Sequence, residues 1–360
     1  MWNENKIAKL LGIRFPIVQA PMANITTPSL VAAISNSGGL GSFAAGYLDP
    51  EEIRIAIRDI RSLTEQPFAV NLFAPSLEET DKKKITQMHK FLNKYRKELG
   101  LPVASLPSRS LPSFKEQFEV VKEEKIPVFS FTFGIPPLPY IQQLKKQQTL
   151  VIGTATSLEE ALLLEKSGVD AMVAQGIEAG GHRGHFLNTH EDSSLTTLTL
   201  VPLLVQHIRV PILAAGGIMT GEGIVAALSV GAQGVQLGTA FIACAESGAS
   251  PIYKRALLHA NHTRTQLTSC FTGKQGRALV NRLTQEIKQN AIAPFPHQHF
   301  LTEDIRLAAS NNQCPDLMAL WAGQGYSFAS NLPAHDILSL LVEQSAEAIH
   351  RLVEQIEGKK

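Results

Sequence analysis

The sequence predicts an α/β protein built on a (β/α)8 barrel. From Pro16 onward, short apolar runs that end in glycine or a polar residue alternate with longer segments of helical periodicity. About eight of these runs are continuously apolar, which is typical of parallel strands buried on both faces. A strand and a helix that alternate about eight times indicate this barrel.

The strands and the helix starts can be placed along the chain. Thr27 precedes Pro28, and Thr156 or Ser157 precedes an acidic first turn, so each is expected to cap a helix. Because these caps directly follow strands, the connecting loops belong to the C-terminal rim, where barrel active sites lie. The expected strands cover residues 16–20, 38–44, 68–73, 128–133, 150–155, 170–175, 211–216 and 234–238.

Two stretches interrupt the alternation. Residues 75–126 predict a helical insertion between the third and fourth strands, with a lysine run that faces solvent. A second excursion covers residues 246–325, and residues 326–360 contain an amphipathic helix expected to pack back on the barrel. The barrel itself is therefore expected within residues 1–245.

The composition favours a small-molecule partner. With 33 Lys and Arg against 32 Asp and Glu, the formal net charge is +1, so no overall field recruits nucleic acid or an anionic membrane. Cys244, Cys270 and Cys314 lie far apart, which favours neither a disulfide framework nor a zinc site. We expect a cytoplasmic protein, because no signal peptide and no apolar segment of roughly 18 residues is present.

Glycine-rich turns follow the seventh and eighth expected strands. "AAGGIMTGEG" contains Gly216 and Gly217, and "QLGTAF" contains Gly238. Bare N–H groups and helix N-termini at these two turns form the phosphate site of many barrels. A phosphate-bearing ligand is therefore expected at this end of the barrel.

Polar amides close two other strands. Asn71 and Gln175 each lie where a strand meets its loop, and a flavin ring needs such neutral donors and acceptors along its pyrimidine edge. Each amide can instead be structural and bind a neighbouring backbone group. Met22, in "QAPMAN", can likewise support a flat cofactor or fill the core.

The loop "GIEAGGHRG", residues 176–184, combines four glycines with an acid, a histidine and an arginine. We expect Glu178 and Arg183 to brace the loop as an ion pair. His185 is a weaker candidate for catalysis than His182. His190, His297 and His299 are expected in polar surface loops, and no metal site is predicted.

Several segments together resemble the class I nitronate monooxygenases, formerly called 2-nitropropane dioxygenases. The resemblance covers about residues 16 to 330 and implies an FMN-containing barrel with a smaller, mostly helical substrate domain. It is carried by "QAPMANITTPSLVAAISNSGGLGSFAAGY", "FAVNLF", "GTATSLEEALLLEKSGVDAMVAQGIEAGGHRG", "ILAAGGI", "GVQLGTAF" and "LWAGQG".

The resemblance also assigns roles to residues. His182 is similar to the family's catalytic histidine, which can take a proton from a nitroalkane or hold an anionic nitronate. Thr132, which stands where relatives carry a histidine, and Trp321 are candidate substrate contacts, although Thr132 can equally fill the core. The expected FMN contacts are Met22, Ala23, Asn24, Asn71, Gln175, Gly180, Gly181, Gly216, Gly217, Gln236, Leu237, Gly238 and Thr239.

The activity that the resemblance implies is oxidative denitrification of nitronates. A nitronate, expected to be propionate 3-nitronate, reacts with O2 through FMN to give a carbonyl compound and nitrite. One alternative is an FMN-dependent enoyl-ACP reductase, whose loops contain a run similar to "EAGGH"; another is a flavin-binding protein without turnover. Both a monomer and a homodimer are compatible with the sequence.

Overall fold

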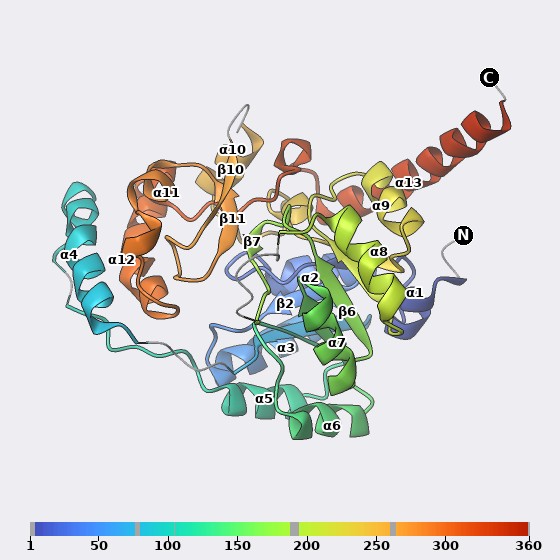
Figure 1. Ribbon diagram of the computed structural model, residues 1–360, viewed down its shortest axis with the longest axis horizontal. Coiled ribbons are helices and arrows are strands. Elements are labelled where there is room, and N and C mark those ends of the chain that lie inside the picture. The colour runs from blue at the N-terminus through green and yellow to red at the C-terminus, as the bar shows by residue number, and fades with distance from the viewer. Residues whose placement is uncertain (1–3, 76–79, 104, 188–193, 260–263, 359–360) are drawn as a thin grey trace.

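The predicted (β/α)8 barrel is confirmed by the computed structural model, which describes residues 4–75, 80–103, 105–187, 194–259 and 264–358. Eight parallel strands form one sheet in the order β1-β9-β8-β6-β5-β4-β3-β2 (Figure 1). A parallel bridge between Val18 and Leu40 joins the two edge strands and closes the barrel. The strands are β1 (Ile17–Gln19), β2 (Gly41–Ala44), β3 (Phe68–Phe73), β4 (Val128–Thr132), β5 (Leu150–Ala155), β6 (Ala171–Gln175), β8 (Ile212–Ala215) and β9 (Gly234–Leu237).

Helices cover the outside of the barrel, and their caps follow the expected chemistry. The side chains of Thr27, Ser157 and Thr220 each accept a hydrogen bond from the first turn of α2, α7 and α9. Apolar side chains fill the space between strands and helices as one large core. The helices are α1 (Lys6–Leu11), α2 (Pro28–Asn36), α3 (Pro50–Leu63), α5 (Phe114–Glu123), α6 (Leu138–Lys146), α7 (Leu158–Ser167), α8 (Thr197–His207), α9 (Gly221–Ser229) and α13 (Ala334–Glu357).

A second unit with its own apolar core lies beyond β9. It contains two antiparallel strands as well as helices, and β7 (Gly181–His182) adds to them as a third strand. The loop expected to carry His182 thus ends as a strand of the second unit's sheet. The elements are α10 (Pro251–Leu258), β10 (Thr265–Thr268), β11 (Gly276–Leu279), α11 (Arg282–Glu286) and α12 (His297–Asn311), with short 3-10 turns at Thr239–Phe241, Gln289–Ala291, Pro315–Leu317 and Tyr326–Phe328.

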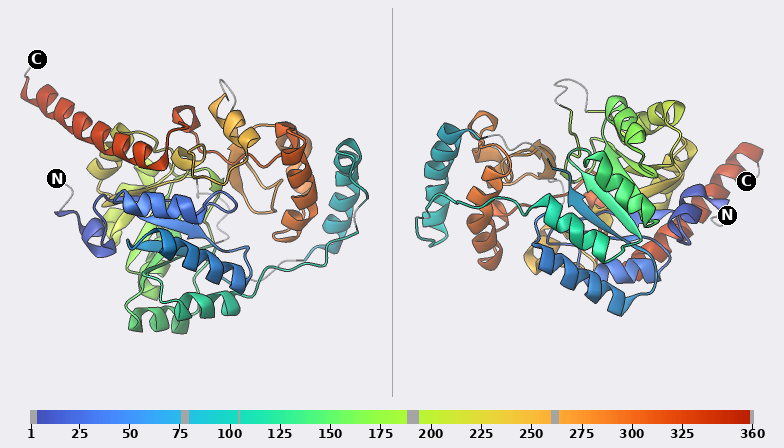
Figure 2. Two further views of the ribbon diagram at one scale, coloured as in Figure 1. Left: turned by 180° about the vertical axis from the view of Figure 1, so that it is seen from behind. Right: turned by 90° about the horizontal axis from the view of Figure 1, so that it is seen from below.

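The expected insertion between β3 and β4 divides into two parts. Helix α4 (Lys82–Glu98) packs against α12 of the second unit, whereas α5 returns to the barrel and packs against α3. Figure 2 shows α4 at the outer edge of the molecule, connected to α5 by an extended segment. The side chain of Arg96 on α4 is only 1% exposed and hydrogen-bonds the Asp304 carboxylate of α12 at 2.7 and 3.2 Å.

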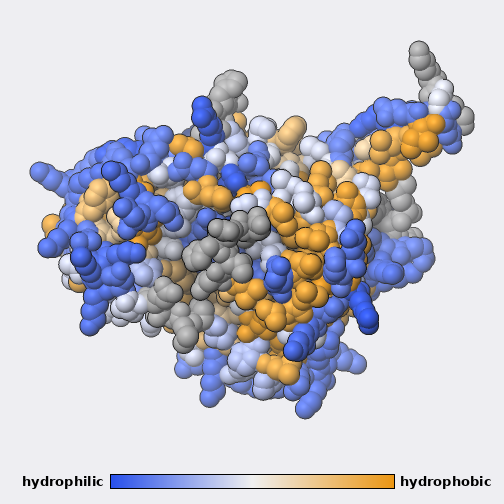
Figure 3. All heavy atoms as spheres, in the orientation of Figure 1, coloured by the Kyte–Doolittle hydropathy of each residue, from blue (hydrophilic) through white to orange (hydrophobic). Residues whose placement is uncertain are grey.

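The C-terminal helix α13 packs against α9 and α2. Its last turns project from the barrel, and Figure 3 shows apolar side chains on this end. Leu352, Val353 and Ile356 are 47%, 45% and 85% exposed there. Among the described residues, no helix is long and apolar enough to cross a bilayer. The division into a barrel (residues 1–245), a helical substrate or lid domain (residues 246–325) and a C-terminal helix (residues 326–360) as separate domains stays a prediction.

We expect Arg96→Met to lower the free energy of unfolding by about 2 kcal/mol, because it removes one partner of a mostly buried charge pair whose carboxylate is partly open to water. Urea unfolding followed by circular dichroism measures this. The matched control is Arg109→Met. It removes an exposed ion pair with Glu303, which lies on α12 next to Asp304, and should change the free energy of unfolding by less than about 0.5 kcal/mol. Equal losses in the two variants would contradict the prediction.

Candidate active site

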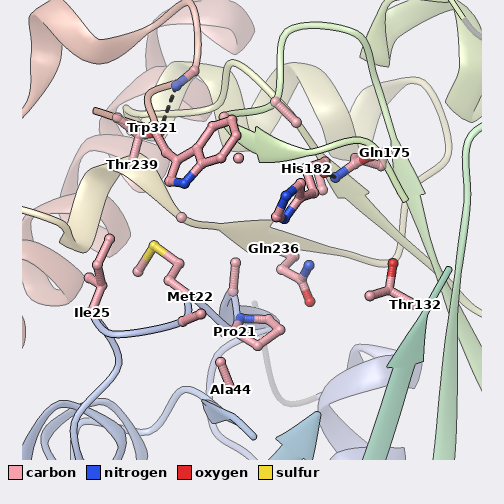
Figure 4. Close-up of a pocket in the computed structure, with 18 of the residues that line it drawn as sticks. Pro21, Met22, Ile25, Ala44, Thr132, Gln175, His182, Gln236, Thr239 and Trp321 are labelled. Atoms are coloured by element: carbon pink, nitrogen blue, oxygen red, sulfur yellow. Dashed lines mark hydrogen bonds between the residues drawn. The ribbon is translucent and has the colours of Figure 1, made fainter. Parts of the chain in front are cut away.

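A cavity opens at the carboxyl ends of the barrel strands, under the second unit. It encloses about 1450 Å³, counted to its open mouth. Figure 4 shows His182 and Trp321 on one side of it and Pro21, Met22 and Ala44 on the other. The barrel thus contributes strand ends and loops to the lining, and the second unit contributes Thr272, His299, Arg306 and Trp321.

The structure brings nearly all of the expected site residues together. Leu237 is the exception: its side chain is 1% exposed and packs in the barrel core, so it does not line the cavity. The expected residues that do line the cavity are Met22, Ala23, Asn24, Asn71, Thr132, Gln175, Gly180, Gly181, His182, Gly216, Gly217, Gln236, Gly238, Thr239 and Trp321.

Glycine is required where the two units approach each other. A Cβ on Gly180 would lie 2.4 Å from the Gly323 nitrogen, and a Cβ on Gly276 would lie 2.6 Å from the Gly181 carbonyl oxygen. Gly181 and Gly217 have φ angles of 73° and 71°, which side chains disfavour. The glycine-rich sequence therefore serves close backbone packing as well as access to a ligand.

His182 is held from both units. His182 pairs with Gly276 of β11 in the sheet of the second unit. The Gln175 side chain of β6 donates a hydrogen bond to the His182 carbonyl oxygen at 2.9 Å. The ring nitrogen Nε2 lies 2.7 Å from the Thr272 hydroxyl, while Nδ1 has no hydrogen-bond partner among the described residues. Phe133 and Trp321 contact the ring, with centroid distances of 5.5 and 4.9 Å. One nitrogen is thus fixed and the other is available to a ligand.

The expected ion pair between Glu178 and Arg183 is wrong. The Glu178 carboxylate accepts hydrogen bonds from the N–H and hydroxyl of Thr197 at the start of α8. The fully buried Arg183 donates instead to the carbonyl oxygens of Gln175 and Gly176 at 2.9 and 2.7 Å. Both residues brace the loop, but through backbone groups and not through each other.

Burial determines the charges in the cavity. It lowers the pKa of His182 to about 3, and the nearby charges of Lys274 and Arg306 lower it further. Burial likewise lowers the pKa of His299 to about 3, again with a contribution from Arg306. Both imidazoles are therefore neutral at neutral pH, and the described residues that line the cavity include no aspartate or glutamate.

Sequence reasoning missed several residues of the site. The expectation that "HQHF" forms a surface turn is wrong, because His297 and His299 both lie on α12, and His299 is 8% exposed and faces the cavity. Tyr47, Thr272 and Arg306 also line the cavity. His190 lies outside the described residues. One available indication was the spacing of His299 and Arg306, which places them on one face of a helix two turns apart.

Lys274 lies beside the site as a second cation. Its Nζ atom is 4.4 Å from the centroid of the Phe133 ring, and burial lowers its pKa. No aspartate or glutamate among the described residues pairs with it within 4.0 Å. In the described part of the chain, no three His, Cys, Asp or Glu residues gather as a metal site.

The lining residues fit a flat, phosphate-bearing heteroaromatic group. The Gln236 amide projects into the cavity and has no hydrogen-bond partner among the described residues (Figure 4). Asn71 uses only its NH2 group, which donates to Ser130 at 2.9 Å. The β8 and β9 strands pair Ala215 with Gln236, so the glycines that follow these strands lie side by side. Gln175, in contrast, is already engaged by the His182 loop.

Comparison with known proteins agrees with this site. A family model described as nitronate monooxygenase matches residues 4–344. The chain belongs to the nitronate monooxygenase family. A probable nitronate monooxygenase of Staphylococcus aureus (strain Newman) is 41% identical over 347 residues, which cover 96% of this chain and 98% of that protein. The chain is therefore an oxidoreductase of this family.

Solved structures extend the comparison to the fold. A nitroalkane oxidase from Streptomyces ansochromogenes is 38% identical with a TM-score of 0.90, covering 96% of this chain and 99% of the other. FabK from Thermotoga maritima is 29% identical with a TM-score of 0.78, covering 98% and 99%. Nitronate monooxygenases are flavin-dependent, which agrees with the amide and glycine lining of the cavity.

We expect Gly276→Ala to reduce activity strongly while the protein stays folded. The added methyl group would lie 2.6 Å from the Gly181 oxygen and 2.7 Å from the Trp321 ring, so β7 and His182 must shift. A shift of about 1 Å in a reacting group can cost about 10²-fold in rate. The measurement is kcat/KM together with the thermal midpoint. The control Gly223→Ala lies on helix α9, where the nearest atom is 3.4 Å away.

We expect acid to destabilise the protein through its buried histidines. Between their ordinary pKa of 6.5 and about 3, His182 and His299 bind protons in the unfolded chain but not in the folded one, so stability falls as pH falls below 6.5. At pH 5 each histidine should account for at most about 2 kcal/mol. Urea unfolding at pH 7 and pH 5 should show a smaller loss in the His182→Gln/His299→Gln variant than in the wild type. An unchanged loss would contradict the assignment.

Proposed function

We propose that this chain is an FMN-dependent nitronate monooxygenase. It would oxidise alkyl nitronates with O2 to a carbonyl compound and nitrite, and propionate 3-nitronate is the first candidate substrate. FMN, and not FAD, is supported by two glycine turns suited to one terminal phosphate, and by the lack of a G-x-G-x-x-G sequence after the first strand.

The observation that carries this proposal is the charge of the cavity. Arg306 lines it, Lys274 lies beside it, and no carboxylate is among the lining residues that the structure describes. Such a site attracts an anion, which a nitronate is and a nitroalkane is not. The depressed pKa of His182 also makes it a weak base, so a substrate that has already lost its proton suits this site better.

In this proposal, the lining residues have distinct roles in binding the cofactor or the substrate. Bound FMN would supply the oxidation chemistry of the reaction. Asn71 and Gln236 would hydrogen-bond its ring, and the backbone at Gly217 and Gly238 would receive its phosphate. His182, fixed by Thr272, would present Nδ1 to the substrate, and Trp321 would cover the reacting groups from water.

One experiment tests the proposal. The purified protein is denatured, the released cofactor is identified by mass, and nitrite release is measured with propionate 3-nitronate and O2. We expect FMN and stoichiometric nitrite. NADPH should reduce the bound flavin only slowly; rapid reduction by NADPH would favour the enoyl-ACP reductase alternative, and bound flavin without any turnover would favour a carrier.

His182→Asn separates the two possible roles of the imidazole. If His182 removes a proton, kcat/KM for a neutral nitroalkane should fall by roughly 10²-fold or more, while that for the matching nitronate should fall less. Bound FMN is quantified in each preparation. His185→Asn is the control, because this neighbouring histidine does not line the cavity. Equal losses that follow the FMN content would show that His182 only braces the loop.

A further inference from the structure

We propose that Arg306 and Tyr47 form a subsite for a carboxylate group of the substrate, separate from the position that His182 faces. The inference rests on the proposed function, because it names the substrates that the cavity would select. Both residues line the cavity, Arg306 from α12 of the second unit and Tyr47 from the loop that follows β2 of the barrel.

Arg306 is a cation that lacks an anionic partner. Its Nε donates to the Thr302 hydroxyl at 3.0 Å, and its Nη2 lies 3.2 Å from the His299 carbonyl oxygen. Nη1 makes no hydrogen bond with the described residues, and no carboxylate among them lies within 4.0 Å of the guanidinium. A desolvated guanidinium without a counter-ion is costly unless a ligand completes it.

Tyr47 supplies an unused donor beside this cation. Its hydroxyl is buried and has no hydrogen-bond partner among the residues that the structure describes. Burial raises its pKa, so the hydroxyl stays protonated and can donate. The ring is fixed, because it stacks on His299 and forms a T-shaped pair with Phe73, with centroid distances of 4.4 and 4.9 Å.

The two groups together match a carboxylate. Guanidinium N–H groups and a phenol hydroxyl can donate to the two oxygens of one planar anion. His299 adds no charge to this arrangement at neutral pH, because its pKa lies near 3. The subsite therefore offers one positive charge and hydrogen-bond donors, and within the described part of the chain neither Asp nor Glu lines the cavity.

Aromatic side chains separate this subsite from His182. Phe133 contacts the His182 ring at 5.5 Å and the Phe73 ring at 4.8 Å, and Phe73 in turn contacts Tyr47. Both phenylalanines line the cavity. An apolar spacer between the nitronate and the carboxylate would pack along these rings, as a short methylene chain does.

The test compares two nitronates that differ only in the tail: propionate 3-nitronate, which ends in a carboxylate, and propyl-1-nitronate, which ends in a methyl group. In Arg306→Met holoenzyme, the ratio of their kcat/KM values should fall at least about 10-fold, as expected for a lost hydrogen bond to a charged group. Tyr47→Phe should lower the ratio by a smaller factor. Arg306→Lys should keep part of the preference, and the control Arg109→Met should keep all of it. If Arg306→Met lowers kcat/KM for both nitronates equally, the subsite is overturned.

A binding measurement keeps this test independent of turnover. Calorimetry on the wild-type holoenzyme should show that 3-nitropropanoate binds at least about 10-fold more tightly than 1-nitropropane, and Arg306→Met should abolish the difference. Equal binding of the two compounds by the wild type would overturn the subsite. A clear binding preference without nitrite release from either nitronate would leave the subsite standing and refute the proposed function.

Discussion

The candidate active site depends on the pairing between β7 and β11, because this pairing positions His182. It joins a loop of the barrel to the sheet of the second unit, with Gly181 opposite Arg277 and His182 opposite Gly276. The Arg183 N–H extends the pairing to the Gln275 carbonyl oxygen at 2.8 Å. Because Thr272 lies in the turn before β11, the same contact brings its hydroxyl to the imidazole. His182 therefore cannot move without the second unit.

Burial lowers the pKa of the histidines and of Arg306 alike, but it leaves them with different charges at neutral pH. Histidine loses its charge easily, so desolvation leaves His182 and His299 neutral. Arginine holds its proton far above neutral pH, so Arg306 keeps its charge in the same surroundings. The cavity is consequently cationic, although the whole chain has a formal net charge of only +1. Local burial, and not overall composition, determines which ligands the site attracts.

The barrel was predictable because its strands are buried on both faces, which requires continuous apolar runs. Residues 68–73 and 150–155 were located to the residue. The glycine turns were predictable too, since positive φ angles at Gly216 and Gly217 disfavour other residues. The β7 strand has only two residues and carries no periodicity, so the sequence could not indicate it. Glu178 shows the same limit: its partner Thr197 is 19 residues away, whereas Arg183 is much nearer in the sequence, so proximity along the chain indicates the wrong partner.

Tyr47, Thr272, His299 and Arg306 were missed because they meet only through the packing of two units. The barrel and the second unit have separate apolar cores, and the cavity lies between them. The barrel strand ends contribute only uncharged groups to the lining, such as Asn71, Thr132 and Gln236, whereas every histidine and arginine among the described lining residues belongs to β7 or α12. Substitutions on the cavity face of α12 can therefore alter charge and shape for the substrate without touching the strands. Since one fold supports many chemistries, we expect this helix, more than the barrel, to distinguish the substrates of related proteins.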